Sequence, residues 1–196
     1  MNSTVKQSEI TTRYHLPGDF AIWVFIFAEL LVFGVFFLSY AFYRASHVEM
    51  FNMYQDTLDR ESGAINTLLL ITSSYFVVRA VSAIKSGDAR RCVNWLAAAL
   101  AGGGGFLVIK SLEFADKFSH GISLGTNTFY MFYLSMTFFH FMHVILGMII
   151  LAAVLFKARA GGYSAEEYTG VETGASYWHM VDLVWIVLFP LVYVIR

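Results

Sequence analysis

Apolar residues along the chain are gathered into five long runs that are separated by short polar segments. The runs cover approximately residues 20–43, 64–84, 93–112, 129–156 and 176–195. A helix needs about 18 or more largely apolar residues to cross the hydrocarbon core of a bilayer, and each run has that length. Isolated strands leave backbone groups unsatisfied in lipid, so each run is predicted to be a helix. The pattern therefore predicts an all-α fold, a polytopic membrane helical bundle with five transmembrane helices.

The composition supports a membrane protein. Hydrophobic residues make up 58% of the 196 residues and charged residues 14%, with a mean hydropathy of +0.61. A soluble domain of this size has no core large enough to bury so much apolar surface. The net charge of -1, with no basic cluster beyond Arg90 and Arg91, gives no electrostatic reason to expect nucleic acid as a partner. Cys92 is the single cysteine, so an internal disulfide and a C-x-x-C site are excluded.

The distribution of basic residues predicts the orientation in the membrane. Seven lie on the side of the N-terminus and of the second and fourth loops: Lys6, Arg13, Lys85, Arg90, Arg91, Lys157 and Arg159. Four lie on the other side: Arg44, Arg60, Lys117 and Arg196. By the positive-inside rule, residues 1–19 form a cytoplasmic N-terminal segment and residues 20–196 a single bundle that ends on the opposite side. Residues 44–62 are expected to be the longest internal loop.

Two sequence features concern how the helices pack. Residues 102–105 read GGGG, and small residues spaced by four let membrane helices approach closely, so a packing face and a hinge are both open interpretations. Pro190 removes one backbone hydrogen bond from the last run and is expected to bend it.

Ionisable residues inside the runs are the candidate functional residues, because a charge at bilayer depth costs at least about 2.5 to 3.5 kcal/mol. Six of them are predicted to form a buried polar cluster within one leaflet: Glu29, Arg79, His140, His143, His179 and Asp182. Pairs spaced i, i+3 share a helix face, which supports this convergence. Lys110 and Glu113 are expected to be an i, i+3 pair that marks the outer membrane interface.

Each of these residues has a structural and a functional interpretation. Glu29 is expected to be protonated, or paired with Arg79 or a protonated histidine. Arg79 alternatively snorkels to the cytoplasmic interface. His140 and His143 either pair within the core or ligate a metal or haem. His179 and Asp182 either fix helix packing or take part in proton movement, with partners expected among Glu29, Arg79 and the histidines of the fourth run.

Five segments in order resemble a known family. They read FAELLVFGVFFLSYAFYR around Glu29, NTLLLITSS at 66–74, SLEFAD around Glu113, FFHFMHVILG with His140 and His143, and SYWHMVDLVWIVLF with His179 and Asp182. The chain resembles subunit III of the haem-copper oxidases across its membrane region, in the short five-helix form. The PGD at 17–19, the short length and the WIVLFPLVYV ending look most like the NorE-type proteins associated with bacterial nitric oxide reductases.

The resemblance implies a non-catalytic accessory subunit in the bacterial inner (cytoplasmic) membrane, with a periplasmic C-terminus. Such a subunit docks on the haem-bearing catalytic subunit I-like protein, holds phospholipids, and supports electron transport and proton uptake. No cofactor is expected on this chain, whereas haem, and copper or non-haem iron, belong to the partner. Glu29 matches the buried carboxylate of the family that reacts with carbodiimides. The residues agree, because a haem-copper centre needs more histidines than the three within the spans.

Two other functions are kept as alternatives. The first is a b-haem electron carrier that uses His140 or His143 together with His179 as axial ligands. The second is a stand-alone proton-conducting or transporter-like protein centred on Glu29, Arg79 and Asp182, since intramembrane ionisable groups mark such paths. The sequence does not distinguish a partner that reduces oxygen from one that reduces nitric oxide.

Overall fold

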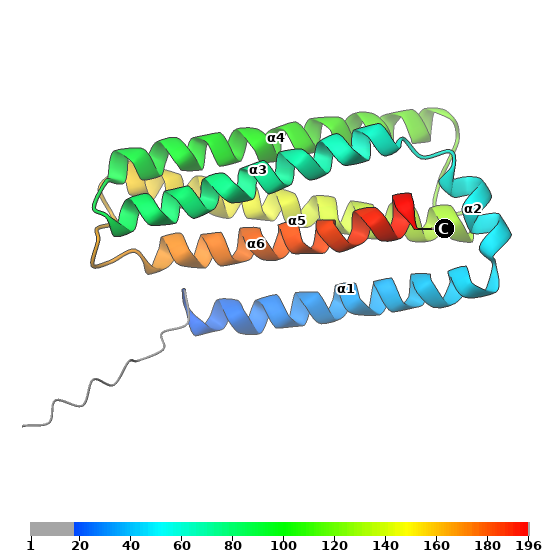
Figure 1. The fold of residues 1–196 in the computed structure, drawn as a ribbon, viewed down its shortest axis with the longest axis horizontal. Coiled ribbons are helices and arrows are strands. Elements are labelled where there is room, and N and C mark those ends of the chain that lie inside the picture. The colour runs from blue at the N-terminus through cyan, green and yellow to red at the C-terminus, as the bar shows by residue number, and fades with distance from the viewer. Residues whose placement is uncertain (1–17, 196) are drawn as a thin grey trace, which may run out of the picture.

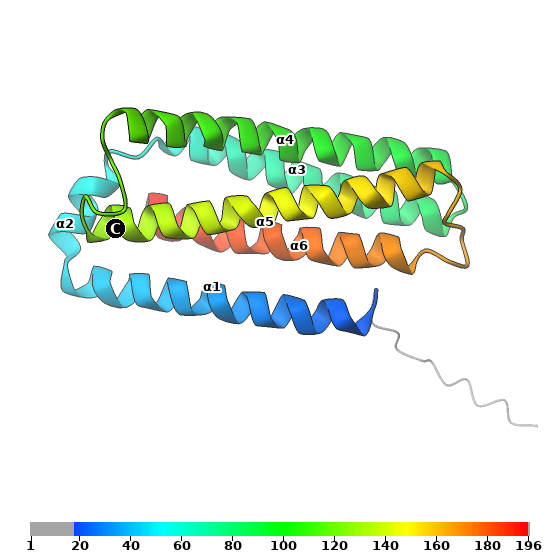
Figure 2. The same cartoon turned by 180° about the vertical axis from the view of Figure 1, so that it is seen from behind.

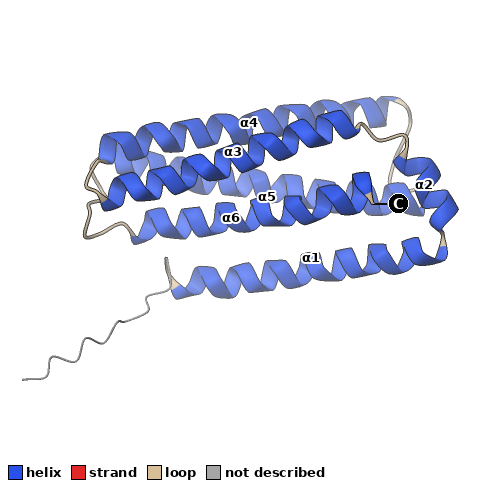
Figure 3. Cartoon of the chain, in the orientation of Figure 1, coloured by secondary structure: helices blue, strands red, loops and turns tan. Residues whose placement is uncertain are grey.

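The computed structural model describes residues 18–195, and that part of the chain is almost entirely helical (Figure 3). Its elements are α1 (Phe20–Ser46), α2 (Val48–Gln55), α3 (Arg60–Lys85), α4 (Ala89–Ser119), α5 (Thr128–Arg159), α6 (Thr169–Phe189) and the π-helical turn η1 (Pro190–Val194). Five of the described helices are long and apolar enough to cross a membrane. The predicted all-α fold with five transmembrane helices is confirmed.

The helices extend beyond the apolar runs because capping side chains, rather than hydropathy, fix where they begin. Asp59 accepts hydrogen bonds from the backbone N–H groups of Glu61 and Ser62 and starts α3. Asp88 caps α4 in the same way, and Asn127 caps α5. Side chains of this kind satisfy N–H groups that have no partner within the helix. The predicted third run, 93–112, is the middle of α4, which begins after Asp88 and continues to Ser119.

Residues 44–62 are not simply a loop, because they contain the short helix α2. Phe51 of α2 is fully buried and packs edge-on against Tyr40, with ring centroids 5.3 Å apart, and against Phe129 at 5.6 Å. The helix has eight residues, three of them polar (Glu49, Asn52 and Gln55), and it is too short for a hydropathy window to detect. This segment is the longest connection between the described spans, as expected, but part of it is helical.

Helices α3 to α6 form a packed group, and α1 lies along one side of it (Figures 1 and 2). α2 lies at one end of the bundle, which is called the α2 end below. α1 buries four of its 27 residues, Ile26, Phe33, Tyr40 and Arg44. Three of these are spaced by seven, so α1 contacts the bundle through one narrow stripe. Its other faces are exposed for lipid or another protein.

Glycines of α4 allow close packing at the centre of the group. A Cβ atom on Gly102 would lie 3.0 Å from Cβ of Ser73 on α3, and one on Gly103 would lie 2.7 Å from the ring of Trp178 on α6. These distances leave no room for a side chain without movement of the neighbour. The run of glycines is therefore a packing face, as one of the two interpretations predicts.

Pro190 ends the regular part of the last helix. The following turn is π-helical, and the N–H of Ile195 donates to the carbonyl of Pro190 at 2.9 Å. Gln55 of α2 donates from Nε2 to the carbonyls of Val192 at 3.0 Å and Ile195 at 3.1 Å. The buried Gln55 side chain thus satisfies carbonyl groups at the end of the helix, and it fastens η1 to α2.

Candidate functional site

Glu29 on α1 and His143 on α5 form a direct pair. Oε2 of Glu29 lies 2.9 Å from Nε2 of His143, and Nδ1 of His143 lies 2.8 Å from the carbonyl of Phe139. A carbonyl can only accept, so Nδ1 carries a proton, and the bond to Glu29 holds one more proton on either side. The pair is a carboxylic acid on a neutral imidazole or a carboxylate on an imidazolium. Both arrangements have no net charge, which suits a site among the rings of Phe33 and Phe139.

His179 on α6 finds its partner on α3. Nδ1 of His179 lies 2.5 Å from the hydroxyl oxygen of Ser74. Oδ1 of Asp182 is buried with no hydrogen-bond partner among residues 18–195. The predicted partners, Glu29, Arg79 and the histidines of α5, are wrong for these two residues. Ser74 carries no charge, so nothing in the sequence marked it beyond its place in the NTLLLITSS segment.

His140 is fully buried but makes no hydrogen bond within the described part of the chain. Its ring stacks on Trp185 with a centroid distance of 5.2 Å, and Phe106 meets it edge-on at 5.6 Å. His140 therefore lies in the core as an aromatic ring, separate from the Glu29–His143 pair.

Arg79 does not join the buried cluster. Its side chain is exposed on α3, and the guanidinium carbon lies 5.3 Å from the ring centre of Trp95 on α4. Because Arg79 is six residues before the end of α3, the charged group is about 9 Å from the end of the helix. This place fits the alternative interpretation, in which a long basic side chain reaches from the apolar region toward the interface.

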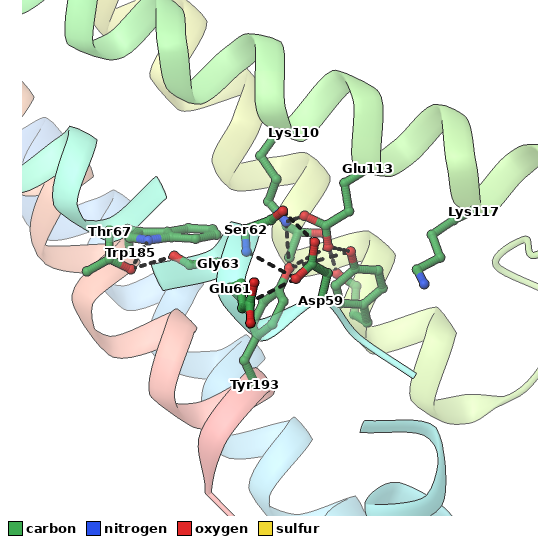
Figure 4. A network of polar contacts seen from close by, with 12 residues as sticks. Asp59, Glu61, Ser62, Gly63, Thr67, Lys110, Glu113, Lys117, Trp185 and Tyr193 are labelled. Carbon is green, nitrogen blue, oxygen red and sulfur yellow. Dashed lines mark hydrogen bonds and ion pairs between the residues drawn. The ribbon is translucent and has the colours of Figure 1, made fainter. Parts of the chain in front are cut away.

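Lys110 and Glu113 are inside the bundle, so the expectation that they mark the outer interface is wrong. Lys110 is 0% exposed and Glu113 8%. Nζ of Lys110 donates to Oε2 of Glu113 at 2.9 Å and to the hydroxyl of Tyr193 at 2.6 Å. Oε1 of Glu113 accepts from Tyr193 at 2.8 Å and from Tyr133. Figure 4 shows Lys110 and Glu113 on α4 pointing toward Tyr193.

Aromatic faces surround the buried ammonium group. Nζ of Lys110 lies 5.2 Å from the ring centres of Trp185 and Tyr193, and 5.6 Å from those of Phe114 and Tyr133. Ring faces attract cations, so these contacts offset part of the lost hydration. Tyr133 and Tyr193 were not among the predicted site residues. Their only signal in the sequence is a hydroxyl within an apolar run, which requires a partner when buried.

The six residues of the predicted cluster do not form one group: Glu29 pairs with His143, His179 bonds to Ser74, and Arg79, His140 and Asp182 belong to neither pair. Both pairs lie near the middle of the bundle, whereas Lys110–Glu113–Tyr133–Tyr193, which was not part of the predicted cluster, lies nearer the α2 end. No group of three or more His, Cys, Asp or Glu side chains within residues 18–195 is arranged to hold a metal ion. The Glu29–His143 pair and the Lys110 network hold helices together by polar contacts whose charges are compensated inside the chain.

Comparison with known proteins identifies the family of the chain. The model of the family "Cytochrome c oxidase subunit III" matches residues 10–195. The cytochrome c oxidase subunit 3 of Thermostichus vulcanus is 35% identical over 173 residues, which cover 88% of this chain and 84% of that protein. The same subunit of Synechocystis sp. is 31% identical over 208 residues, covering 100% and 88%. The quinol oxidase subunit 3 of Bacillus spizizenii is 26% identical, covering 98% and 92%. The chain belongs to the cytochrome c oxidase subunit III family.

Proposed function

We propose that the chain works as a non-catalytic accessory subunit that docks on a haem-bearing, subunit I-like membrane protein, stabilises it, and supports its electron transport and proton uptake. The observation that carries the proposal is the internal pairing of the ionisable groups. Lys110 with Glu113 and Glu29 with His143 neutralise each other within the chain. Polar groups that are satisfied in this way strengthen a scaffold, whereas a substrate site needs open polar groups that converge.

The exposed apolar surface supports a role as a docking and lipid-binding subunit. Residues along α1 such as Phe27, Leu31, Leu38 and Phe42 are each at least 65% exposed. An apolar space of about 550 Å³ lies between the end of α4 and the start of α5, next to Phe114 and Phe138. In a bilayer these surfaces are covered by acyl chains or by a neighbouring subunit. We assign phospholipid to the space beside Phe114.

Within this role the identity of the partner is the finer proposal. Features at 17–19 and at the C-terminal end favour a bacterial nitric oxide reductase, while the relatives above are named as subunits of cytochrome c and quinol oxidases. The proposal places the chain in the bacterial inner membrane with a cytoplasmic N-terminus, as the basic residues favour. The partner carries haem, and copper or non-haem iron.

The two alternative functions fit the contacts less well. A b-haem carrier using His143 requires a free ring nitrogen, but Nε2 is bonded to Glu29 and Nδ1 to the Phe139 carbonyl. Both nitrogens of His140, the other ligand in this alternative, are enclosed by the core, where Trp185 and Phe106 pack against the ring. A proton path centred on Glu29, Arg79 and Asp182 requires these groups to connect, but Arg79 faces away over Trp95. Absorption spectra of the purified chain test the first alternative, and proton-tight reconstituted vesicles count against the second.

Affinity purification from native membranes in a mild detergent tests the proposed function. We expect a haem protein to co-purify in a fixed ratio and to be lost or inactivated faster when the gene for the chain is deleted. Measuring oxygen and nitric oxide consumption by the same preparation identifies the partner. The proposal is wrong if the chain purifies alone and the deletion changes neither the amount nor the lifetime of any haem protein.

A further inference from the structure

A cleft separates α1 from α3 and α6, with a cavity volume of about 690 Å³. This volume is within the usual range of sites for small molecules, about 300 to 1,000 Å³. Most lining residues are apolar, and Phe27, Val78 and Leu183 are each at least 50% exposed, so the cleft opens toward the hydrocarbon of the bilayer. An occupant can therefore enter from the membrane.

The end of the cleft away from α2 is closed by a neutral ion pair. Nζ of Lys85 lies 2.7 Å from Oε1 of Glu172 and 5.2 Å from the ring centre of Tyr168. The backbone N–H of Gly18 donates to the other oxygen of Glu172 at 3.3 Å. Because Lys85 is already neutralised, this end offers no spare positive charge to an anionic head group. The charge balance favours an uncharged amphiphile.

One side chain inside the cleft presents an open hydrogen-bonding atom. His179 lines the cleft seven residues beyond Glu172 on α6, which places it about 10 Å deeper. Nδ1 of His179 is bonded to Ser74, while Nε2 has no partner among residues 18–195 and is not enclosed by protein. An open imidazole nitrogen in an apolar cleft is a specific point of attachment for a polar head group.

The Ser74 hydroxyl lets this nitrogen either accept or donate. When the hydroxyl accepts from Nδ1–H of His179, Nε2 is left as an acceptor. When the hydroxyl donates to Nδ1, Nε2 carries the hydrogen. The two groups thus suit a ligand atom that exists as a hydroxyl or as a carbonyl. The ester and phosphodiester oxygens of a phospholipid only accept.

We propose that the cleft binds an isoprenoid quinol, with one ring hydroxyl on Nε2 of His179 and the tail along the apolar wall that Ile26, Phe27 and Leu30 form on α1. The oxidised quinone fits the reversed hydrogen-bond direction in the same place. The inference concerns binding by this chain alone, and it holds whichever catalytic subunit the chain accompanies. A quinol held at this position lies within the membrane.

The test measures retention of decylubiquinol by nanodiscs that contain the full chain, with empty nanodiscs subtracted to remove partitioning into lipid. We expect saturable binding of one quinol per chain. His179→Phe removes the open nitrogen and keeps a ring, and Val78→Trp fills the cleft from α3; each is expected to weaken binding at least tenfold. His120→Phe changes an exposed histidine at the α2 end and serves as the matched control, with unchanged binding.

A ligand-side comparison keeps the test decisive if a variant fails to fold. The dimethyl ether of decylubiquinol has the same tail but no hydroxyl hydrogen, and it is expected to bind the unaltered chain at least tenfold more weakly. Absence of saturable quinol binding overturns the proposal. The proposal is also overturned if the ether binds as tightly as the quinol, or if His179→Phe binds the quinol as tightly as the unaltered chain does. It is overturned as well if the chain retains phospholipid tightly, Val78→Trp abolishes that retention, and quinol is not held.

Discussion

Replacing Lys110 by methionine is the most direct probe of the buried network in α4. The substitution keeps the apolar stem and removes the ammonium group, which is fully buried and bonded to Glu113 and Tyr193. The Glu113 carboxylate would then remain in the interior without its counter-charge. The hydroxyls of Tyr133 and Tyr193 still donate to it, so part of its hydrogen bonding survives.

The expected cost follows from these contacts. Removing one partner of a buried ion pair destabilises a protein by about 3 to 5 kcal/mol, because the remaining charge is uncompensated. Lost cation–π contacts add about 0.5 to 2 kcal/mol, and the remaining tyrosine bonds offset a similar amount. We therefore expect the free energy of unfolding to fall by about 3 to 5 kcal/mol. For a chain of this size that corresponds to a melting temperature lower by about 6 to 20 °C.

Thermal unfolding of the purified chain in detergent, followed by circular dichroism, measures the effect. Lys157→Met is the matched control, because Lys157 is exposed and its loss should cost less than about 1 kcal/mol. Adding Glu113→Gln to Lys110→Met should recover part of the loss, since the amide is uncharged and its oxygen still accepts from both tyrosines. The reasoning is refuted if Lys110→Met melts within about 2 °C of the unaltered chain, or if the double variant is no more stable than the single one.

Three further substitutions test the other contacts. Glu29→Gln keeps a hydrogen bond to His143 through its amide, so it should leave assembly intact and change partner turnover only mildly, measured on the co-purified complex. Gly103→Ala should cost about 1 to 3 kcal/mol in thermal unfolding because its Cβ meets a tryptophan ring. Asp59→Ala should cost about 1 kcal/mol through loss of a helix cap. Hydrogen bonds from Ser62 lower the pKa of Asp59, so this stability contribution is present above its unfolded pKa, about 3.9, and is lost as the pH falls further.

Each of these expectations has an outcome that contradicts it. Failure of Glu29→Gln to fold would make the carboxylate a packing element. Gly104→Ala is the control for Gly103→Ala, since the nearest atom to its Cβ would be 4.0 Å away. Equal effects of the two glycine variants would mean that crowding by Trp178 does not set the cost, because helix propensity favours alanine at both positions. A difference between Asp59→Ala and the unaltered chain that persists unchanged at pH 2 would argue against the cap.

The fold could be predicted because the bilayer allows few solutions. Every backbone group must be paired within lipid, so five long apolar runs can only be five helices. The ends of the helices could not be placed from hydropathy, because polar caps such as Asp59 and Asp88 extend α3 and α4 into polar sequence. α2 escaped prediction for a related reason, since its stability comes from the packing of Phe51 on other helices.

The site was predicted in part. Pairing of Glu29 with a histidine was one of the predicted alternatives, and the structure selects His143. The position of Lys110 could not be found from the sequence, since the apolar run stops at residue 112 whereas α4 continues to Ser119, about 10 Å further. A residue that seemed to mark the interface is therefore within the bundle. Which way a side chain points also depends on the neighbouring helices, which explains why Ser74, and not Glu29, is the partner of His179.

α1 contacts the bundle through only one narrow stripe, because the hydrophobic effect does not drive helices together once they lie in lipid. Apolar burial alone does not hold such helices together, so polar contacts and close packing must. α1 has the Glu29–His143 bond near its middle, and at its start the N–H groups of Gly18 and Asp19 bond to Glu172 and Thr173 of α6. The cleft lies between these two points of attachment, along Trp23 to Leu30. A helix held at two heights by polar bonds, and packed between them only through a narrow stripe that includes Ile26, leaves room beside that stripe for a membrane-soluble ligand.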